Sequence, residues 1–197
     1  YVTEIQHVLQ QVMADGEPRS LDPDTIASPG TWNAVRRAAG AAVAATDAVI
    51  DGNARNAFCA VRPPGHHATR HAAMGFCFFN NVAIAARHAV DVRGLERVAI
   101  IDFDVHHGNG TEDIIAGDER VLMVSIFQHP FYPYSGGVPM GPNMVNVPIP
   151  AYTRGPEIRS LIEANWMPRL ESFRPQMLFI SAGFDAHRED DLGQLGL

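Results

Sequence analysis

Apolar residues along this chain fall into short continuous runs that alternate with segments of helical spacing. The runs are bounded by Gly and Pro and are too short for helices, so they predict buried strands. We expect strands at Ala57–Val61, Arg97–Phe103, Val121–Ile126 and Met177–Ala182. Helices are expected at Thr31–Ile50, Asn80–Val90, Thr111–Ala116 and Gly155–Phe173. This alternation favours an α/β fold with a parallel sheet flanked by helices.

The strand expected at Arg97–Phe103 leads into an unusual polar cluster. Asp102, Asp104 and His106 occupy alternate positions, so in extended chain their side chains point to one face. Two other loops that follow expected strands carry His66-His67 and Asp185. Loops at the carboxyl ends of parallel strands meet at one edge of the sheet. We therefore expect one metal held by Asp104, His106 and Asp185, with a position left open for water, as in catalytic zinc sites.

Metal-assisted hydrolysis of an amide or ester also needs a base to take the proton of water. His66 or His67 is suited to this role, and Asp102 is the candidate carboxylate that orients it. Simpler interpretations remain open at this point. A histidine pair can be a turn or core feature, and an Asp after a strand can cap a helix or stabilise a turn.

Length, composition and charge narrow the class of protein. The chain has 197 residues, of which 46% are hydrophobic, which predicts one domain over residues 1–197. Its net charge of -7 argues against nucleic-acid binding and suits a cationic substrate. Two cysteines exclude a disulfide framework. Without an apolar run of about 20 residues or a signal sequence, we expect no membrane contact and a cytoplasmic location.

Four motifs are similar to those of the histone deacetylase superfamily, especially its class II-like members and the acetylpolyamine amidohydrolases. They span about residues 56–191 and begin at Arg62, Gly75, Asp102 and Ser181, with the sequences RPPGHHA, GFCFFNN, DFDVHHGNGT and SAGFDA. The resemblance implies an arginase/deacetylase-like three-layer fold. It also implies a zinc enzyme that removes acetyl groups from an acetylated lysine peptide or an acetylated polyamine.

The resemblance assigns roles residue by residue. Asp104, His106 and Asp185 match the zinc ligands, and His66 and His67 match the tandem acid/base histidines. Asp102 matches the partner of His66, while Asn109, in the class II pattern, matches the partner of His67. The implied acyl-lysine tunnel and structural potassium site involve further positions: Gly75, Phe76 and Phe131 or Tyr132 for the tunnel, and Asp102, Asp104, His106, Ser125 and Ile126 for potassium.

The chain also departs from the family pattern. The family's oxyanion-stabilising tyrosine lies in a Gly-Gly-Tyr motif after the last zinc ligand, and neither that motif nor the family's opening strand has a match here. We therefore expect an incomplete domain, truncated at both ends, whose uncovered sheet edges favour a homo-oligomer. One alternative is a catalytically weak acyl-lysine or small-molecule binding module that retains the metal. Another is an arginase-like enzyme with two manganese ions.

Overall fold

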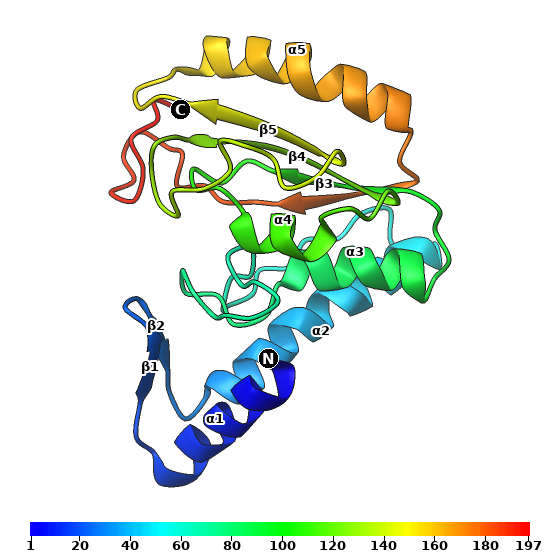
Figure 1. Cartoon of the computed structure of the whole chain (residues 1–197). Coiled ribbons are helices and arrows are strands. Elements are labelled where there is room, and N and C mark those ends of the chain that lie inside the picture. Colours follow the sequence, from blue (N-terminus) through cyan, green and yellow to red (C-terminus); the bar gives the residue numbers. More distant parts are fainter.

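The computed structural model describes all 197 residues and contains eleven helices and strands, joined by turns and loops. Four parallel strands form the main sheet in the order β5-β4-β3-β6 (Figure 1). The elements along the chain are α1 (Val2–Asp15), β1 (Arg19–Asp22), β2 (Thr25–Ala27), α2 (Thr31–Ile50), α3 (Asn81–Asp91), β3 (Val98–Asp102), α4 (Asn109–Ile115), β4 (Val121–Gln128), β5 (Met144–Ile149), α5 (Gly155–Phe173) and β6 (Met177–Ser181).

The register of the sheet places the polar strand ends beside one another. The central strand β3 pairs in parallel with β4 on one side and β6 on the other. Asp102, the last residue of β3, lies opposite Ser125 of β4 and Ser181 of β6. The predicted α/β fold with a parallel sheet is therefore confirmed. It could be predicted because parallel strands covered on both faces have continuous apolar sequences.

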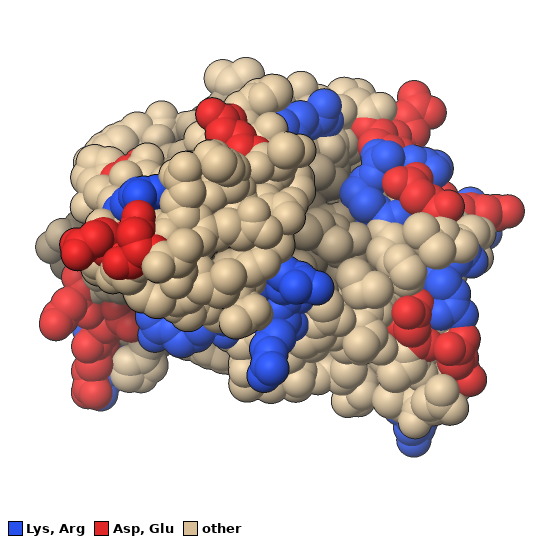
Figure 2. All heavy atoms as spheres, turned by 90° about the horizontal axis from the view of Figure 1, so that it is seen from below, with Lys and Arg blue, Asp and Glu red and all other residues tan.

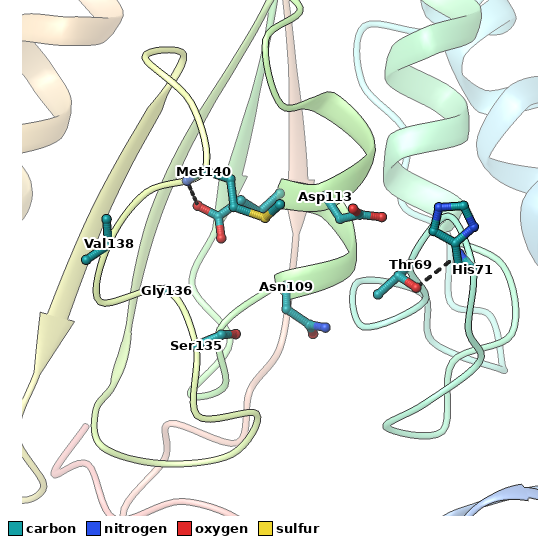
Figure 3. Close-up of a pocket in the computed structure, with 9 residues that line it drawn as sticks. Thr69, His71, Asn109, Asp113, Ser135, Gly136, Val138 and Met140 are labelled. Atoms are coloured by element: carbon teal, nitrogen blue, oxygen red, sulfur yellow. Dashed lines mark hydrogen bonds between the residues drawn. The ribbon is translucent and has the colours of Figure 1, made fainter.

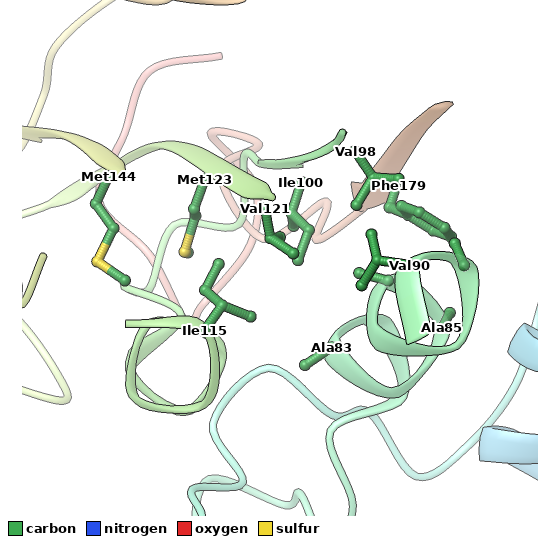
Figure 4. Packing of buried hydrophobic residues seen from close by; sticks show 12 residues of the cluster. Ala83, Ala85, Val90, Val98, Ile100, Ile115, Val121, Met123, Met144 and Phe179 are labelled. Atoms are coloured by element: carbon green, nitrogen blue, oxygen red, sulfur yellow. The ribbon is translucent and has the colours of Figure 1, made fainter. Parts of the chain in front are cut away.

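Helices cover both faces of the sheet and make three layers (Figure 1). On one face α3 and α4 pack against the strands through a cluster of apolar side chains, including Ala85, Ile100, Ile115 and Met123 (Figure 4). On the other face α5 contributes Ile158 and Trp166 to a second cluster. The alanines of α3 let this helix approach the sheet closely, and burial of the branched residues stabilises the layer.

A third apolar cluster joins the amino-terminal elements to the body. Leu9 and Val12 of α1 pack with Val35 of α2 and with Phe78. The antiparallel hairpin formed by β1 and β2 stands beside α1, away from the main sheet (Figure 1). Neither α1 nor this hairpin is predicted from the sequence pattern. The helical spacing of Val2, Ile5, Leu9 and Val12 does mark α1 in the sequence, and the sequence prediction overlooked it. The two strands of the hairpin are only four and three residues long and carry too few apolar residues to alternate clearly.

The strand predicted at Ala57–Val61 is wrong. This segment forms no strand, and its only backbone bond within the run joins the Val61 amide to the Cys59 carbonyl. An apolar run becomes a strand only where a neighbouring strand offers its backbone groups, and no strand lies beside this one. The His66-His67 loop therefore follows an irregular segment, although the other two functional loops follow strands as predicted.

Strand β5 is missing from the predicted elements for the opposite reason. Met144–Ile149 contains Pro148, which normally argues against a strand. In the structure β5 pairs only with β4 and forms the edge of the sheet. Proline is tolerated at such an edge because no second neighbour requires its missing N–H.

Many charged side chains lie next to partners of opposite sign. The face seen in Figure 2 carries acidic and basic groups side by side near its left and right ends, and a basic group at its lower centre has uncharged surface around it. Arg87 and Arg120 both bond to Asp118, and Arg93 bonds to Asp47 and Asp51. Exposed pairs of this kind stabilise the fold only slightly. None of the helices is long and apolar enough to cross a bilayer.

Candidate metal centre

Asp104, His106 and Asp185 meet at the carboxyl-terminal edge of the sheet, on the loops that follow β3 and β6. Their donor atoms all lie within 4.8 Å of one another. Nδ1 of His106 lies 3.1 Å from Oδ1 of Asp104 and 2.9 Å from Oδ2 of Asp185. Backbone amides fix both carboxylates, since His106 N–H donates to Asp104 and Val105 N–H donates to Asp185. The three residues expected as metal ligands are therefore brought together and pre-oriented.

The chemistry of these donors fits one divalent cation. Two carboxylates face a single imidazole nitrogen, and all three side chains retain about 15% of their exposure. Oxygen and imidazole nitrogen are both zinc ligands in proteins. The site is also shaped by Gly183, where a Cβ atom would lie only 2.0 Å from Oδ2 of Asp104. A larger residue at this position would displace the carboxylate from its place among the donors.

The tandem histidines lie beside this cluster, each with a separate partner. Nδ1 of His66 is 3.0 Å from Oδ2 of Asp102, and Nδ1 of His67 is 2.8 Å from Oδ1 of Asn109. The two imidazole rings are 4.0 Å apart between centroids, and both are buried. The partners expected from the family resemblance are thus in contact with the expected histidines.

The surroundings tune the two histidines in opposite directions. Burial disfavours the charged form of His66, but the carboxylates of Asp104 and Asp102 outweigh it and raise its pKa to about 9. Burial and the positive charge of His66 lower the pKa of His67 to about 2. Asn109 is neutral and adds no compensating charge. The surroundings thus favour the protonated form of His66 and the neutral form of His67, and such opposite shifts in neighbouring groups are typical of acid–base sites.

The long loop after β4 places aromatic rings over Asp104, His106 and Asp185, which together are called the metal-type cluster below. The ring of Phe131 stacks on His106 with a centroid distance of 5.3 Å and an angle of 18°. Tyr132 meets His67 edge to face at 5.1 Å and His106 at 6.0 Å. Burial, and the nearby carboxylates of Asp24 and Asp22, raise the pKa of Tyr132 to about 12. Both candidates for this wall of the tunnel therefore touch the site.

Gly75 and Phe76 are the other residues expected to line the tunnel. They form a turn in which both have positive φ, 56° and 64°. A Cβ atom at Gly75 would lie 2.4 Å from Cδ2 of His67, so only glycine fits against this ring. Phe76 is half exposed. No direct contact places its ring on the metal-type cluster, and its role in a tunnel stays a prediction.

Two residues of the hairpin hold this turn, and sequence reasoning missed them. Asp24 accepts a hydrogen bond from the Gly75 amide at 3.1 Å, and Thr25 accepts one from the Phe76 amide at 3.0 Å. The bonded residues are 51 positions apart in the sequence. No local pattern marks such a contact. The only available signal is the pair of Asp residues in Leu21-Asp22-Pro23-Asp24, which reads as an ordinary turn.

The residues expected for potassium lie around the end of β3. Ser125 stands opposite Asp102 in the register of β3 and β4, with Ile126 as the next residue. Asp102 accepts the Asp104 amide, and the Ser125 hydroxyl bonds to Asn146. Asp102 and Ser125 are almost completely buried. These groups are neighbours, and a potassium ion among them stays a prediction.

A hollow of about 330 Å³ lies beside Asn109, between the start of α4, the loop around Ser135 and the turn at Thr69 (Figure 3). Figure 3 shows Val138 and Met140 on one side of it, with Thr69 and His71 on the other. Glu112 and Asp113 also line this space. The long loop after β4 therefore borders two features, the aromatic cover of the metal-type cluster and this hollow.

Comparison with known proteins gives a consistent result. A family model described as histone deacetylase domain matches residues 1–197. The histone deacetylase-like amidohydrolase of Pseudomonas aeruginosa is 40% identical over 200 residues, which cover 97% of this chain and 53% of that protein. The polyamine deacetylase HDAC10 of Rattus norvegicus is 41% identical, over 85% of this chain and 30% of that protein.

Solved structures agree with the sequence relatives. The crystal structure of the HDA15 HD domain superposes with a TM-score of 0.91 at 35% identity, and the match covers 98% of this chain and 57% of that one. An acetylpolyamine aminohydrolase from Burkholderia pseudomallei gives a TM-score of 0.86 at 32% identity, over 98% and 67%. The chain spans about half the length of the Pseudomonas relative. With the model matched from end to end and the arginase/deacetylase-like sheet in place, this chain belongs to the histone deacetylase family.

Proposed function

We propose that this chain carries the metal and histidine machinery of a zinc-dependent amidohydrolase. The substrate would be an acetylated lysine peptide or an acetylated polyamine, and the reaction would release acetate. One observation carries this proposal: Asp104, His106 and Asp185 converge beside two histidines whose pKa values are shifted in opposite directions. Relatives whose names specify polyamine deacetylase and acetylpolyamine aminohydrolase support the class of substrate.

Asp104, His106 and Asp185 would hold the zinc ion. Zinc at such a site lowers the pKa of a coordinated water and polarises the acyl carbonyl. The carboxylates are held in place by the amides of Val105 and His106, so they need little rearrangement. We also propose a structural potassium ion near Asp102, Asp104, His106, Ser125 and Ile126.

His67 would act as the general base. Its Nδ1–H donates to the Asn109 oxygen, which leaves Nε2 without a proton and free to accept one from the attacking water. The low pKa of this imidazole keeps it neutral before the reaction. The same Nε2 would then return the proton to the leaving amine, as general acid–base catalysis requires.

His66 would stay protonated through the cycle. Its Nδ1–H donates to Asp102, and its Nε2 lies 3.7 Å from Oδ2 of Asp104. The charge of this imidazolium favours negative charge that develops on the substrate nearby. Phe131 and Tyr132 would enclose the methylene chain of the acylated amine and exclude water.

Zinc binding is the first test, by equilibrium dialysis of the chain against Zn²⁺. We expect one ion per chain and a large loss of affinity in D104N, H106A and D185N. The exposed His187 lies outside the cluster, so H187A is a matched control with unchanged affinity. Two ions per chain would instead favour the arginase-like alternative, and unchanged binding in all three variants would exclude this site.

Acetate release by the full-length protein is the second test, from acetyl-lysine peptides and from acetylated polyamines. We expect H67A to lower turnover by at least about 100-fold, the usual contribution of a general base. The exposed His71 provides the control variant H71A. If the protein binds zinc and a hydroxamate but releases no acetate from any member of the panel, the binding-module alternative is correct.

A further inference from the structure

Glu112 is a buried carboxylate that lies outside the metal-type cluster. It belongs to α4, and only 2% of its side chain surface is exposed. Its partner His107 is equally buried, with Nε2 at 2.7 Å from Oε2 of Glu112. A buried charge is costly unless hydrogen bonds satisfy it. The bonds of Glu112 therefore indicate what this side chain holds in place.

The second oxygen of Glu112 binds two other segments of the chain. Oε1 accepts the Met140 amide at 3.0 Å, a bond drawn in Figure 3, and the side-chain amide of Asn146 at 2.9 Å. Nδ2 of Asn146 also donates to the Gly136 carbonyl at 3.0 Å. Burial alone would raise the pKa of Glu112, but the bonds from His107 and the Met140 amide lower it. One ionised side chain thus joins α4, β5 and the long loop.

This cluster supplies the only hydrogen bonds between residues 130–141 and the rest of the molecule. Those bonds are Met140 N–H to Glu112 and Asn146 to the Gly136 carbonyl. A further backbone bond, from Tyr134 to Phe131, stays within the loop. The same loop carries the rings that stack on His106 and His67. A loop of this length is mobile unless it is tied down.

We infer that Glu112 is a positioning residue, which holds the aromatic loop over the metal centre by accepting the Met140 and Asn146 N–H groups. This inference rests on the proposed function only where it says what the positioning serves, which is to place aromatic rings over a zinc site. The carboxylate touches neither the proposed metal nor a substrate. It acts through the backbone at Met140, and its effect on the site is the placement of Phe131 and Tyr132.

Hydrogen exchange of the chain tests the positioning without any assay of activity. In E112A, the Met140 amide, which donates to Glu112, should exchange on the order of tenfold faster or more, since bonds to a charged group are among the stronger ones. The Tyr134 amide, the other hydrogen-bonded donor of this segment, should exchange faster as well once the loop is released. E112Q keeps an oxygen acceptor and should retain nearly wild-type protection. The exposed Glu163 on α5 gives the charge-matched control E163Q, for which no change is expected.

N146A keeps the test decisive if E112A fails to fold, because it removes the second tether and leaves the carboxylate. This variant should also accelerate exchange in residues 130–141. Equal acceleration in β4 would indicate general destabilisation and would overturn the inference. Exchange as fast in E112Q as in E112A would overturn it too, since charge and not the acceptor position would then matter.

Two hydroxamates connect the positioning to the proposed site. With the zinc-loaded chain, E112A should weaken binding of a long-chain alkyl hydroxamate on the order of tenfold. Binding of acetohydroxamate, which is too short to reach the aromatic loop, should not change. If wild-type chain binds neither compound, the proposed function fails while the exchange result still stands. If E112A weakens both equally, the effect is on the metal and the positioning inference is wrong.

Discussion

Replacing Gly183 by alanine should remove a metal ligand without unfolding the protein. Gly183 follows β6 and precedes Asp185 by two residues. A methyl group at this position would lie 2.0 Å from Oδ2, 2.4 Å from Cγ and 2.6 Å from Cβ of Asp104. No backbone atom is among these contacts, and the φ angle of Gly183 is one that alanine adopts. The strain therefore falls on Asp104, and because its Cβ atom cannot rotate away, the backbone at Asp104 must shift slightly as well.

The displacement follows from the contact distances. Ordinary van der Waals contact begins at 3.4 Å, so Oδ2 of Asp104 must move by 3.4 minus 2.0, or about 1.4 Å. Metal–ligand distances tolerate changes of only about 0.2 Å. Loss of a ligand weakens a site more than loss of an outer hydrogen bond, which costs about 10–100-fold. We expect zinc affinity to fall by at least about 100-fold.

Zinc affinity is measured by competition with a chromogenic chelator, and circular dichroism checks that the fold is intact. Gly40 lies within α2, and a methyl group there meets nothing within 4 Å, so G40A is the matched control. It should bind zinc as wild type does. If folded G183A binds zinc within about threefold of wild type, a factor below 1 kcal/mol, the assignment of Asp104 as a ligand is refuted.

Three further predictions concern stability, each measured by urea unfolding. Asn143→Ala should lower the free energy of unfolding by about 3 kcal/mol, because its Nδ2 bonds three carbonyls, of Ile115, Asp118 and Val121; a loss below about 1 kcal/mol would contradict this. Tyr132→Phe should raise it by about 1 kcal/mol, because the Tyr132 hydroxyl is buried without a partner; a decrease would show that a partner exists. Burial alone would raise the pKa of Glu112, but its hydrogen bonds lower this pKa below the usual 4.5. The contribution of Glu112 to the free energy of unfolding is therefore fully present above pH 4.5 and is lost as the pH falls through the folded-state pKa. The difference between wild type and E112Q should therefore shrink as the pH falls below 4.5, and a constant difference would be inconsistent with this shift.

Much of the sheet and of the candidate metal site can be predicted from the sequence, because both depend on strand ends. Strands β3, β4 and β6 are buried between helices and therefore show continuous apolar runs. Their carboxyl ends meet at one edge, so Asp104 and Asp185 could be predicted to converge although they lie far apart in the sequence. In the structure the Val105 amide, next to Asp104, donates to Asp185, 80 positions away. Alternation of Asp and His directly after a buried strand indicates a shared cation, because charges in such a place need partners.

Features that depend on distant contacts left no such signal. Glu112 lies in a short helix, where an acidic residue normally faces water, and nothing in its neighbours predicts 2% exposure. Asp24 and Thr25 contact a turn 51 positions away. The apolar run at Ala57–Val61 was misleading because an apolar sequence does not itself provide a neighbouring strand. In each case the outcome depends on whether a partner distant in the sequence is present.

The hairpin contact separates two properties that one site combines. Asp24 and Thr25 fix the turn at Gly75 and Phe76, whereas the metal-type donors depend on the loops after β3 and β6. The hairpin packs with α1 and α2 in an apolar cluster that also includes Ala73 and Phe78, and it stands apart from the sheet (Figure 1). A change at Asp24 or Thr25 should therefore alter the turn that packs Gly75 against His67, while the backbone bonds that orient Asp104 and Asp185 stay in place.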